Sequence, residues 1–283
     1  MTFNFRKIYA TDPIFREIRE RNKSDYLFFR NYANELTIMS GNAKNNTSGK
    51  AHSYASYLIR LVYIYEDFYN EELDNLLSFD TLKKIEKVVN SSGFQEYNQT
   101  EWHYPNSAFK CYVSCLIYLN RSSENTADII LNESLEKANY MKNYNNSNCI
   151  NGAQKREAKI KNGINYAYPR KLEESMKAKM NSNWRCELDT DHETFICQST
   201  KTPYVEAHHL IPMAAQDYYE NTLDFADNIV ALCPNCHRMI HHATNEVKSI
   251  ALKTLFENRV VKYPTYGIDI NFDKLLNFYE ILK

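Results

Sequence analysis

The amino-acid sequence predicts an α+β protein, in which a mainly α-helical N-terminal domain precedes a smaller domain of mixed secondary structure. Two observations support this division. Apolar and aromatic residues recur at helical spacing between residues 53 and 68. Further along the chain, residues 204–211 and 227–232 have the composition of short strands, and the second of them runs directly into a segment rich in cysteine and histidine.

Helical periodicity in the N-terminal domain predicts helices at residues 53–68, 81–89 and 107–119. Ser107 is expected to be the N-cap of the last of these. Residues 40–50 and 90–106 are rich in asparagine, serine and glycine and are predicted to be loops. We interpret the aromatic residues of this domain as core residues rather than as a platform for stacking bases.

Length and composition are those of a folded protein with room for two domains. The chain has 283 residues, of which 43% are hydrophobic and 24% charged. No stretch is apolar enough to span a membrane, and residues 1–10 lack the apolar core of a signal peptide. We therefore expect a cytoplasmic protein with no membrane partner.

A basic segment separates the two predicted domains. Residues 142–179 contain nine Lys or Arg and three Glu, although the net charge of the whole chain is −1. The segment is either a solvated linker or a local patch that contacts phosphates. A helix is predicted within it, from Pro169 to Met180. The expected organisation is a helical domain at 1–142, a basic linker with a helix at 143–180, and a second domain with helices at its C-terminal end at 181–283.

Cysteine and histidine usage indicates metal binding. The seven cysteines are odd in number and include the closely spaced pair Cys233 and Cys236, which argues against a disulfide framework. Six of the eight histidines lie between residues 192 and 242. His237 and His241 are four residues apart, so on a helix both rings would reach one ion. The adjacent His208 and His209 would point to opposite sides of a strand and therefore serve different tasks.

The order and spacing of these residues resemble the HNH endonuclease family. The resemblance rests on Glu206-Ala-His-His-Leu-Ile-Pro, on Asp227-Asn-Ile-Val-Ala-Leu-Cys-Pro-Asn-Cys-His, and on His241. It covers roughly residues 184–245 and implies a ββα-metal nuclease domain with a zinc knuckle. The C-terminal tail resembles, more weakly, the extensions of HNH proteins that occur with restriction systems.

The resemblance implies a role for each matching residue. His209 would be the general base that activates water, a task suited to an imidazole whose pKa lies near neutrality. His208, His237 and His241 would hold one catalytic divalent ion, Mg²⁺ or Mn²⁺. Asn228 would orient His209 and hold the loop. Glu206 either orients a ligand imidazole or caps the strand on a solvated face.

A structural zinc site is also predicted. Cys233 and Cys236 have the spacing of half such a site, which takes four ligands. Cys186 is the expected third ligand, although the CxxC pair usual in the family at that place is missing. The fourth is His192 or Cys197, and the shorter loop favours His192. If it is not a ligand, Cys197 is expected to be a small buried apolar residue.

These features predict an enzyme that hydrolyses phosphodiester bonds in DNA, as a restriction or phage-defence nuclease. Arg170, Lys171 and Arg238 are the expected contacts to substrate. Residues 1–142 are expected to recognise DNA or a partner protein, and a homodimer would explain cleavage of both strands. The alternatives are a nuclease for RNA or branched DNA, and a zinc-stabilised nucleic-acid-binding module with a silent active site.

Overall fold

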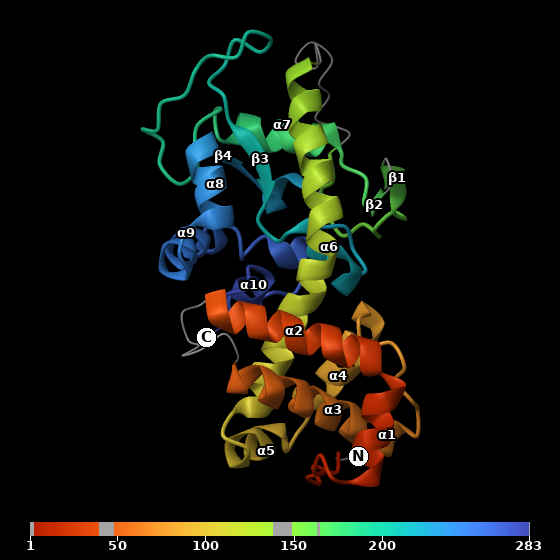
Figure 1. Cartoon of the computed structure of the whole chain (residues 1–283). Helices are drawn as coiled ribbons and strands as arrows, with labels where there is room; N and C mark the ends of the chain where they lie inside the picture. The colour runs from red at the N-terminus through yellow and green to blue at the C-terminus, as the bar shows by residue number, and fades with distance from the viewer. Residues whose placement is uncertain (1–2, 40–47, 138–148, 163–164, 283) are drawn as a thin grey trace. The chain divides into compact units, whose positions relative to one another are not determined.

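The computed structural model describes residues 3–39, 48–137, 149–162 and 165–282, and the chain divides into two compact units. Unit 1 consists of residues 1–117 together with 282–283, and unit 2 of residues 118–281 (Figure 1). This division differs from the predicted boundaries at residues 142 and 180. One long helix continues across the border between the units, and the segment predicted as a linker packs within unit 2.

Unit 1 is helical, as predicted. Its elements are α1 (Pro13–Arg21), α2 (Lys23–Met39), α3 (Gly49–Tyr69), α4 (Phe79–Val89), α5 (Phe94–Thr100) and the first half of α6 (Tyr104–Lys137). The predictions at 53–68 and 81–89 are confirmed by α3 and α4. The predicted loop at 90–106 is wrong in part, because it contains α5 and the start of α6. Of the other predicted loop, residues 40–47 lie outside the described residues.

The aromatic residues of unit 1 build its core. Phe15, Phe29 and Tyr112 are among the largest fully buried side chains, and the rings of Phe29 and Tyr112 meet edge to face. Leu58 and Leu61 of α3 are completely buried. The interpretation of the aromatic side chains as core is confirmed for these three residues, whereas Tyr9 and Tyr69 are exposed.

Helix α6 is much longer than predicted. It begins at Tyr104, so Ser107 is not an N-cap; its hydroxyl donates instead to the carbonyl of His103. The helix continues to Lys137, where a polar run at residues 120–126 had hidden the helical pattern. Leu131 and Leu135, four residues apart, are 3% exposed and pack with Met176.

Unit 2 is built around a small antiparallel sheet. Strand β3 (Glu206–His209) pairs with β4 (Ile229–Leu232) so that His208 lies opposite Val230. Helix α8 (Pro234–His242) follows β4, which completes a β–β–α arrangement. Helix α7 (Leu172–Asn181) packs against β4 and confirms the predicted helix, with its start shifted past Pro169. A short hairpin, β1 (Ile160–Asn162) and β2 (Asn165–Ala167), precedes α7.

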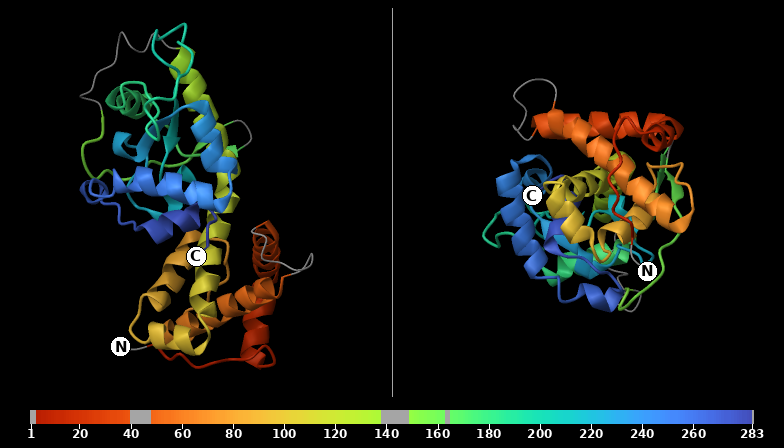
Figure 2. Two further views of the ribbon diagram at one scale, coloured as in Figure 1. Left: turned by 90° about the vertical axis from the view of Figure 1, so that its left-hand side faces the viewer. Right: turned by 90° about the horizontal axis from the view of Figure 1, so that it is seen from below.

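The second half of α6 closes one edge of this sheet (Figure 2). The side-chain oxygen of Asn132 accepts from the backbone N–H of Ala207 at 2.8 Å, and its amide donates to the Ala207 carbonyl at 3.1 Å. One side chain thereby satisfies both polar groups that a third strand would otherwise pair.

Helices α9 (Asn245–Glu257) and α10 (Phe272–Phe278) complete unit 2 and confirm the predicted C-terminal helical extension. Ala251, Leu252 and Leu255 of α9 and Leu275, Leu276 and Phe278 of α10 are buried. Among the described residues, no helix is long and apolar enough to cross a membrane.

Candidate active site and metal centres

Three histidines from β3 and α8 meet beside the sheet of unit 2. The donor atoms of His208, His237 and His241 all lie within 4.8 Å of one another. The Nε2 atoms of His237 and His241 are 3.3 Å apart. Two ligands of a tetrahedral ion at the usual metal–nitrogen distance lie about 3.4 Å apart. The spacing therefore fits a shared metal ion, and the one-turn offset on α8 brings the two rings together as the sequence predicted.

Glu206 fixes the orientation of His237. The His237 Nδ1–H donates to Glu206 Oε2 at 2.5 Å, which leaves Nε2 to face the metal centre. The hydroxyl of Tyr204 donates to the other carboxylate oxygen at 3.1 Å. The hydrogen bond with His237 lowers the pKa of Glu206, so this carboxylate stays charged. Of the two interpretations of Glu206, the structure supports the orienting one.

Tyr279, which directly follows α10, holds His208 in the same way. Its hydroxyl lies 2.9 Å from the carbonyl oxygen of Leu210 and 2.8 Å from Nε2 of His208. Because the hydroxyl donates to the carbonyl, its oxygen accepts the Nε2–H of His208. Nδ1 of His208 is then the nitrogen with a free lone pair. Burial is the main cause that lowers the pKa of His208, which keeps the ring neutral and able to bind a metal.

His209, the expected general base, is not placed where it would meet water in this structure. Its side chain is 1% exposed and lies between two carboxylates. Nε2 donates to Asp224 at 2.8 Å, whereas Nδ1 lies 3.4 Å from Asp128 of α6. Burial lowers the pKa of His209, but the interactions with Asp128 and Asp224 outweigh it, so the net shift is upward.

Asn228 holds the chain just beyond His209. Completely buried, it accepts from the backbone N–H of Ile211 at 2.9 Å and donates to the carbonyls of Ile211 at 3.0 Å and Leu223 at 2.8 Å. These bonds fix the turn after β3. Asp224, rather than Asn228, makes the hydrogen bond to His209.

The three predicted substrate contacts lie in different surroundings. Arg170 is 5% exposed and bonds to Glu124 at 2.9 Å and Asp128 at 2.7 Å, so in this structure it does not reach solvent. Lys171 is half-buried in an ion pair with Glu157. Arg238 is exposed on α8.

The basic segment is not a free patch, because several of its cations pair within unit 2. Arg156 donates to the carbonyls of Gln216 and Tyr219, and Lys159 pairs with Asp217 at 2.7 Å. Lys155 and Lys161 are exposed, whereas Lys142 lies outside the described residues.

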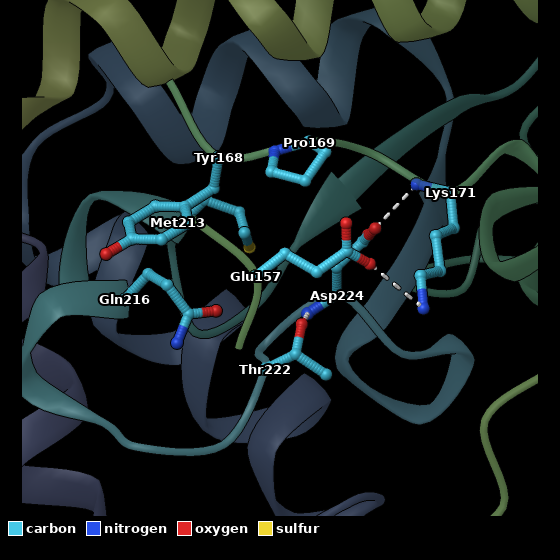
Figure 3. A pocket seen from close by; sticks show the side chains of 8 residues that line it. All are labelled: Glu157, Tyr168, Pro169, Lys171, Met213, Gln216, Thr222 and Asp224. Carbon is cyan, nitrogen blue, oxygen red and sulfur yellow. Dashed lines mark hydrogen bonds and ion pairs between the residues drawn. The ribbon is translucent and has the colours of Figure 1, made fainter. Parts of the chain in front are cut away.

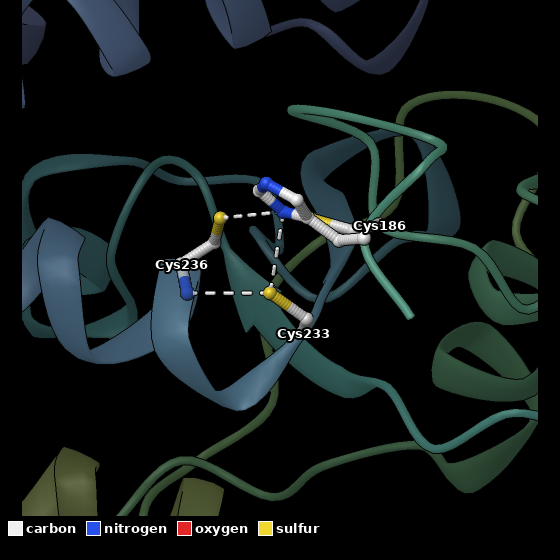
Figure 4. A group of neighbouring side chains, drawn as sticks. Cys186, Cys233 and Cys236 are labelled. Carbon is white, nitrogen blue, oxygen red and sulfur yellow. Dashed lines mark hydrogen bonds between the residues drawn. The ribbon is translucent and has the colours of Figure 1, made fainter. Parts of the chain in front are cut away.

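The predicted zinc ligands come together. Donor atoms of Cys186, His192, Cys233 and Cys236 lie within 4.8 Å of one another, and Figure 4 shows the three cysteines turned toward one point. Nδ1 of His192 lies 3.6 Å from the Cys233 sulfur and 3.3 Å from the Cys236 sulfur. A tetrahedral zinc ion places sulfur and nitrogen ligands about 3.6 Å apart, so this donor set fits zinc.

Cys197 is not part of that cluster. It is half-buried and belongs to a tight turn in which its N–H donates to Thr202. The choice of His192 over Cys197 therefore agrees with the geometry, but the expectation that Cys197 is buried is wrong.

Asp224, the hydrogen-bond partner of His209, also lines a small pocket. Figure 3 shows Asp224 among its lining residues, where it accepts the backbone N–H of Lys171 at 2.6 Å. The other lining residues are Glu157, Tyr168, Pro169, Lys171, Met213, Gln216 and Thr222. Both carboxylate oxygens of Asp224 are thus engaged, one toward His209 and one toward Lys171, which fixes the carboxylate in place.

Comparison with known proteins identifies the class of domain to which this site belongs. Residues 194–243 match the family model of the HNH endonuclease, so the chain contains an HNH endonuclease domain. Over 60 residues of this region, the chain is 42% identical to the Type IV methyl-directed restriction enzyme EcoKMcrA of Escherichia coli (strain K12). That stretch covers 21% of this chain and 20% of the enzyme, so only about a fifth of the relative's length is matched. No solved structure matches.

Sequence reasoning missed three residues that contact the candidate site, namely Asp128, Asp224 and Tyr279. Asp224 lies 15 residues after His209, close enough to have been considered. Asp128 and Tyr279 lie outside the HNH match, and no motif marks either of them.

Proposed function

We propose that the protein is a metal-dependent endonuclease that hydrolyses phosphodiester bonds in DNA, as a restriction-type enzyme. The observation that carries this proposal is the convergence of His208, His237 and His241 at metal-binding distances beside His209. The HNH match and the restriction enzyme among the relatives support the same activity. The name of that relative also makes methylated DNA a substrate to test.

Each residue would contribute one part of the hydrolysis. A divalent ion held by the three imidazoles would offset charge on the phosphodiester. His209 donates Nε2–H to Asp224, which leaves Nδ1 as the nitrogen able to take a proton from water. Asn228 would keep the turn beyond His209 rigid through its three backbone hydrogen bonds.

The donor set bears on which ion is used. Three neutral imidazoles are ligands that suit transition metals, whereas Mg²⁺ prefers carboxylates and water. Of the two ions predicted from the sequence, we therefore propose Mn²⁺. In the cysteine cluster, three thiolates and one imidazole suit Zn²⁺.

Two adjacent histidines provide a matched test. His241 belongs to the metal cluster, whereas its neighbour His242 is exposed and lies outside it. We expect His241→Ala to lose cleavage of plasmid DNA in Mn²⁺ and His242→Ala to keep it. The substrates are unmodified and methylated duplex DNA, with single-stranded RNA and four-way junctions digested in parallel. Cleavage restricted to RNA or junctions would replace the DNA assignment.

One observation favours a second candidate function, a zinc-stabilised nucleic-acid-binding module with a silent active site. The side chain of His209 is 1% exposed, and Asp128 faces the nitrogen that would act as base. A wild-type protein that binds Mn²⁺ and zinc but cleaves none of these substrates would establish this alternative.

A further inference from the structure

Arg170 and His209 converge on a single carboxylate oxygen. Nε of Arg170 lies 2.7 Å and Nδ1 of His209 lies 3.4 Å from Oδ1 of Asp128. Arg170 donates a hydrogen bond to this oxygen, and the buried Nδ1 of His209 lies beside it without a hydrogen-bond partner of its own. A guanidinium and an imidazole nitrogen that lie beside one oxygen form a site for an anion, and the same groups suit a phosphate. His209 directly follows the metal ligand His208 on β3, so this anion site adjoins the three-histidine centre.

Of the acidic groups around Arg170 and His209, Asp128 can turn away with the least loss of contacts. Arg170 keeps its bond to Glu124 at 2.9 Å, and His209 keeps its bond to Asp224 at 2.8 Å. Glu124 and Asp224 are each 3% exposed, whereas the side chain of Asp128 is 23% exposed and lies at the edge of the site. Its departure would therefore leave Arg170 and His209 each with an acidic partner.

The backbone around Asp128 is held from both sides. Glu124 lies one turn earlier on α6 and is bound to Arg170. Asn132 lies one turn later and is bound to the edge of β3. Leu131 is buried in the core of unit 2. A change at Asp128 would thus be a rotation of its side chain, while the helix backbone stays in place.

We propose that Arg170 and His209 form a phosphate subsite of the nuclease, and that Asp128 occupies this subsite in place of the phosphodiester. The inference rests on the proposed function. It accounts for the burial of Arg170, the predicted substrate contact, and of His209, the predicted general base. Substrate binding would require the Asp128 carboxylate to turn toward solvent. Asp128 therefore acts as an intramolecular competitor that lowers the affinity for nucleic acid.

The test compares two neutralising substitutions on α6. Asp128→Asn removes the competing charge, whereas Glu133→Gln removes an equal charge from an exposed position on the same helix. Binding of a fluorescein-labelled DNA duplex to zinc-loaded protein, without added Mn²⁺ or Mg²⁺, is measured by anisotropy. We expect Asp128→Asn to bind about tenfold more tightly than wild type, and Glu133→Gln to change affinity less than about twofold. Adding Arg170→Gln to Asp128→Asn should remove the gain.

Equal affinities for the two neutralising variants, or weaker binding by Asp128→Asn, would overturn the inference. Thermal unfolding shows whether Asp128→Asn is folded, and Asp128→Ala takes its place if it is not. Cleavage in Mn²⁺ is measured separately. If Asp128→Asn binds DNA more tightly but no variant cleaves it, the proposed function is refuted and the phosphate subsite stands. If wild type cleaves DNA but Asp128→Asn binds no more tightly, the proposed function stands and the subsite is refuted.

Discussion

At the scale of single residues, the three-histidine centre depends on which nitrogen of each ring carries the proton. Glu206 accepts a hydrogen bond from the Nδ1–H of His237, and Tyr279 accepts one from the Nε2–H of His208. Partners of this kind fix the tautomer and orientation of a ligand imidazole before the ion arrives. The candidate metal centre is therefore preorganised by two side chains that are not among its three candidate ligands.

Tyr279→Phe is expected to weaken Mn²⁺ binding by about 10- to 100-fold, because His208 loses the acceptor of its Nε2–H. Isothermal titration calorimetry on zinc-loaded protein measures this affinity directly. Tyr266→Phe is the matched control, since it removes a hydroxyl bonded to Asp227. If both variants bind Mn²⁺ as wild type does, Tyr279 does not position His208.

At the scale of elements, α6 helps to hold strand β3 in place and forms part of the core of unit 2. Asn132 pairs with both backbone groups of Ala207, and Leu131 and Leu135 pack with Met176. The strand that carries His208 and His209 is thus held on one edge by β4 and on the other by a helix side chain.

Asn132→Ala should lower the free energy of unfolding by about 2 kcal/mol, because it leaves two backbone groups of β3 without partners. Denaturant titration of the whole chain measures the change. In Ser134→Ala, which removes only a hydroxyl bonded to Ile130 within the helix, the change should stay within about 0.5 kcal/mol. Equal losses in the two variants would show that the contact with Ala207 contributes nothing specific.

The cysteine cluster joins the start of α8 to the loop at Cys186. Cys233→Ser removes one ligand and is expected to destabilise unit 2 by on the order of several kcal/mol, since metal binding in such sites is folding energy. Zinc content should fall together with the melting temperature. Cys197→Ser, outside the cluster, should change neither. A Cys233→Ser protein that melts like wild type would contradict the zinc assignment.

At the scale of the whole molecule, the two metal centres should be separable. Removal of weakly bound divalent ions by gel filtration is expected to stop DNA cleavage without unfolding, and added Mn²⁺ should restore more activity than Mg²⁺, because three imidazoles suit a transition metal. Excess EDTA, which also removes zinc, should in addition lower the melting temperature. Restoration by Mg²⁺ equal to that by Mn²⁺ would contradict the ion assignment.

The agreement between sequence and structure is best where contacts are local. His237 and His241 share a helix face, and Cys233 and Cys236 share a helix start, so spacing alone placed them. The fourth member of the cluster, His192, followed from a short loop. By contrast, a polar run concealed half of α6. Arg170, predicted to contact substrate, and His209, predicted to be the general base, lie against acidic residues distant in the chain.

The sequence by itself, through ligand spacing and its resemblance to the HNH family, predicted the candidate metal-binding residues and the β–β–α unit that carries them, because such motifs are properties of short segments. Only the tertiary structure decided what surrounds His209 and His208. Asp128 and Tyr279 reach these rings from α6 and from the residue after α10, segments far from β3 in the chain. Long-range packing brings such groups together, and no local pattern records it.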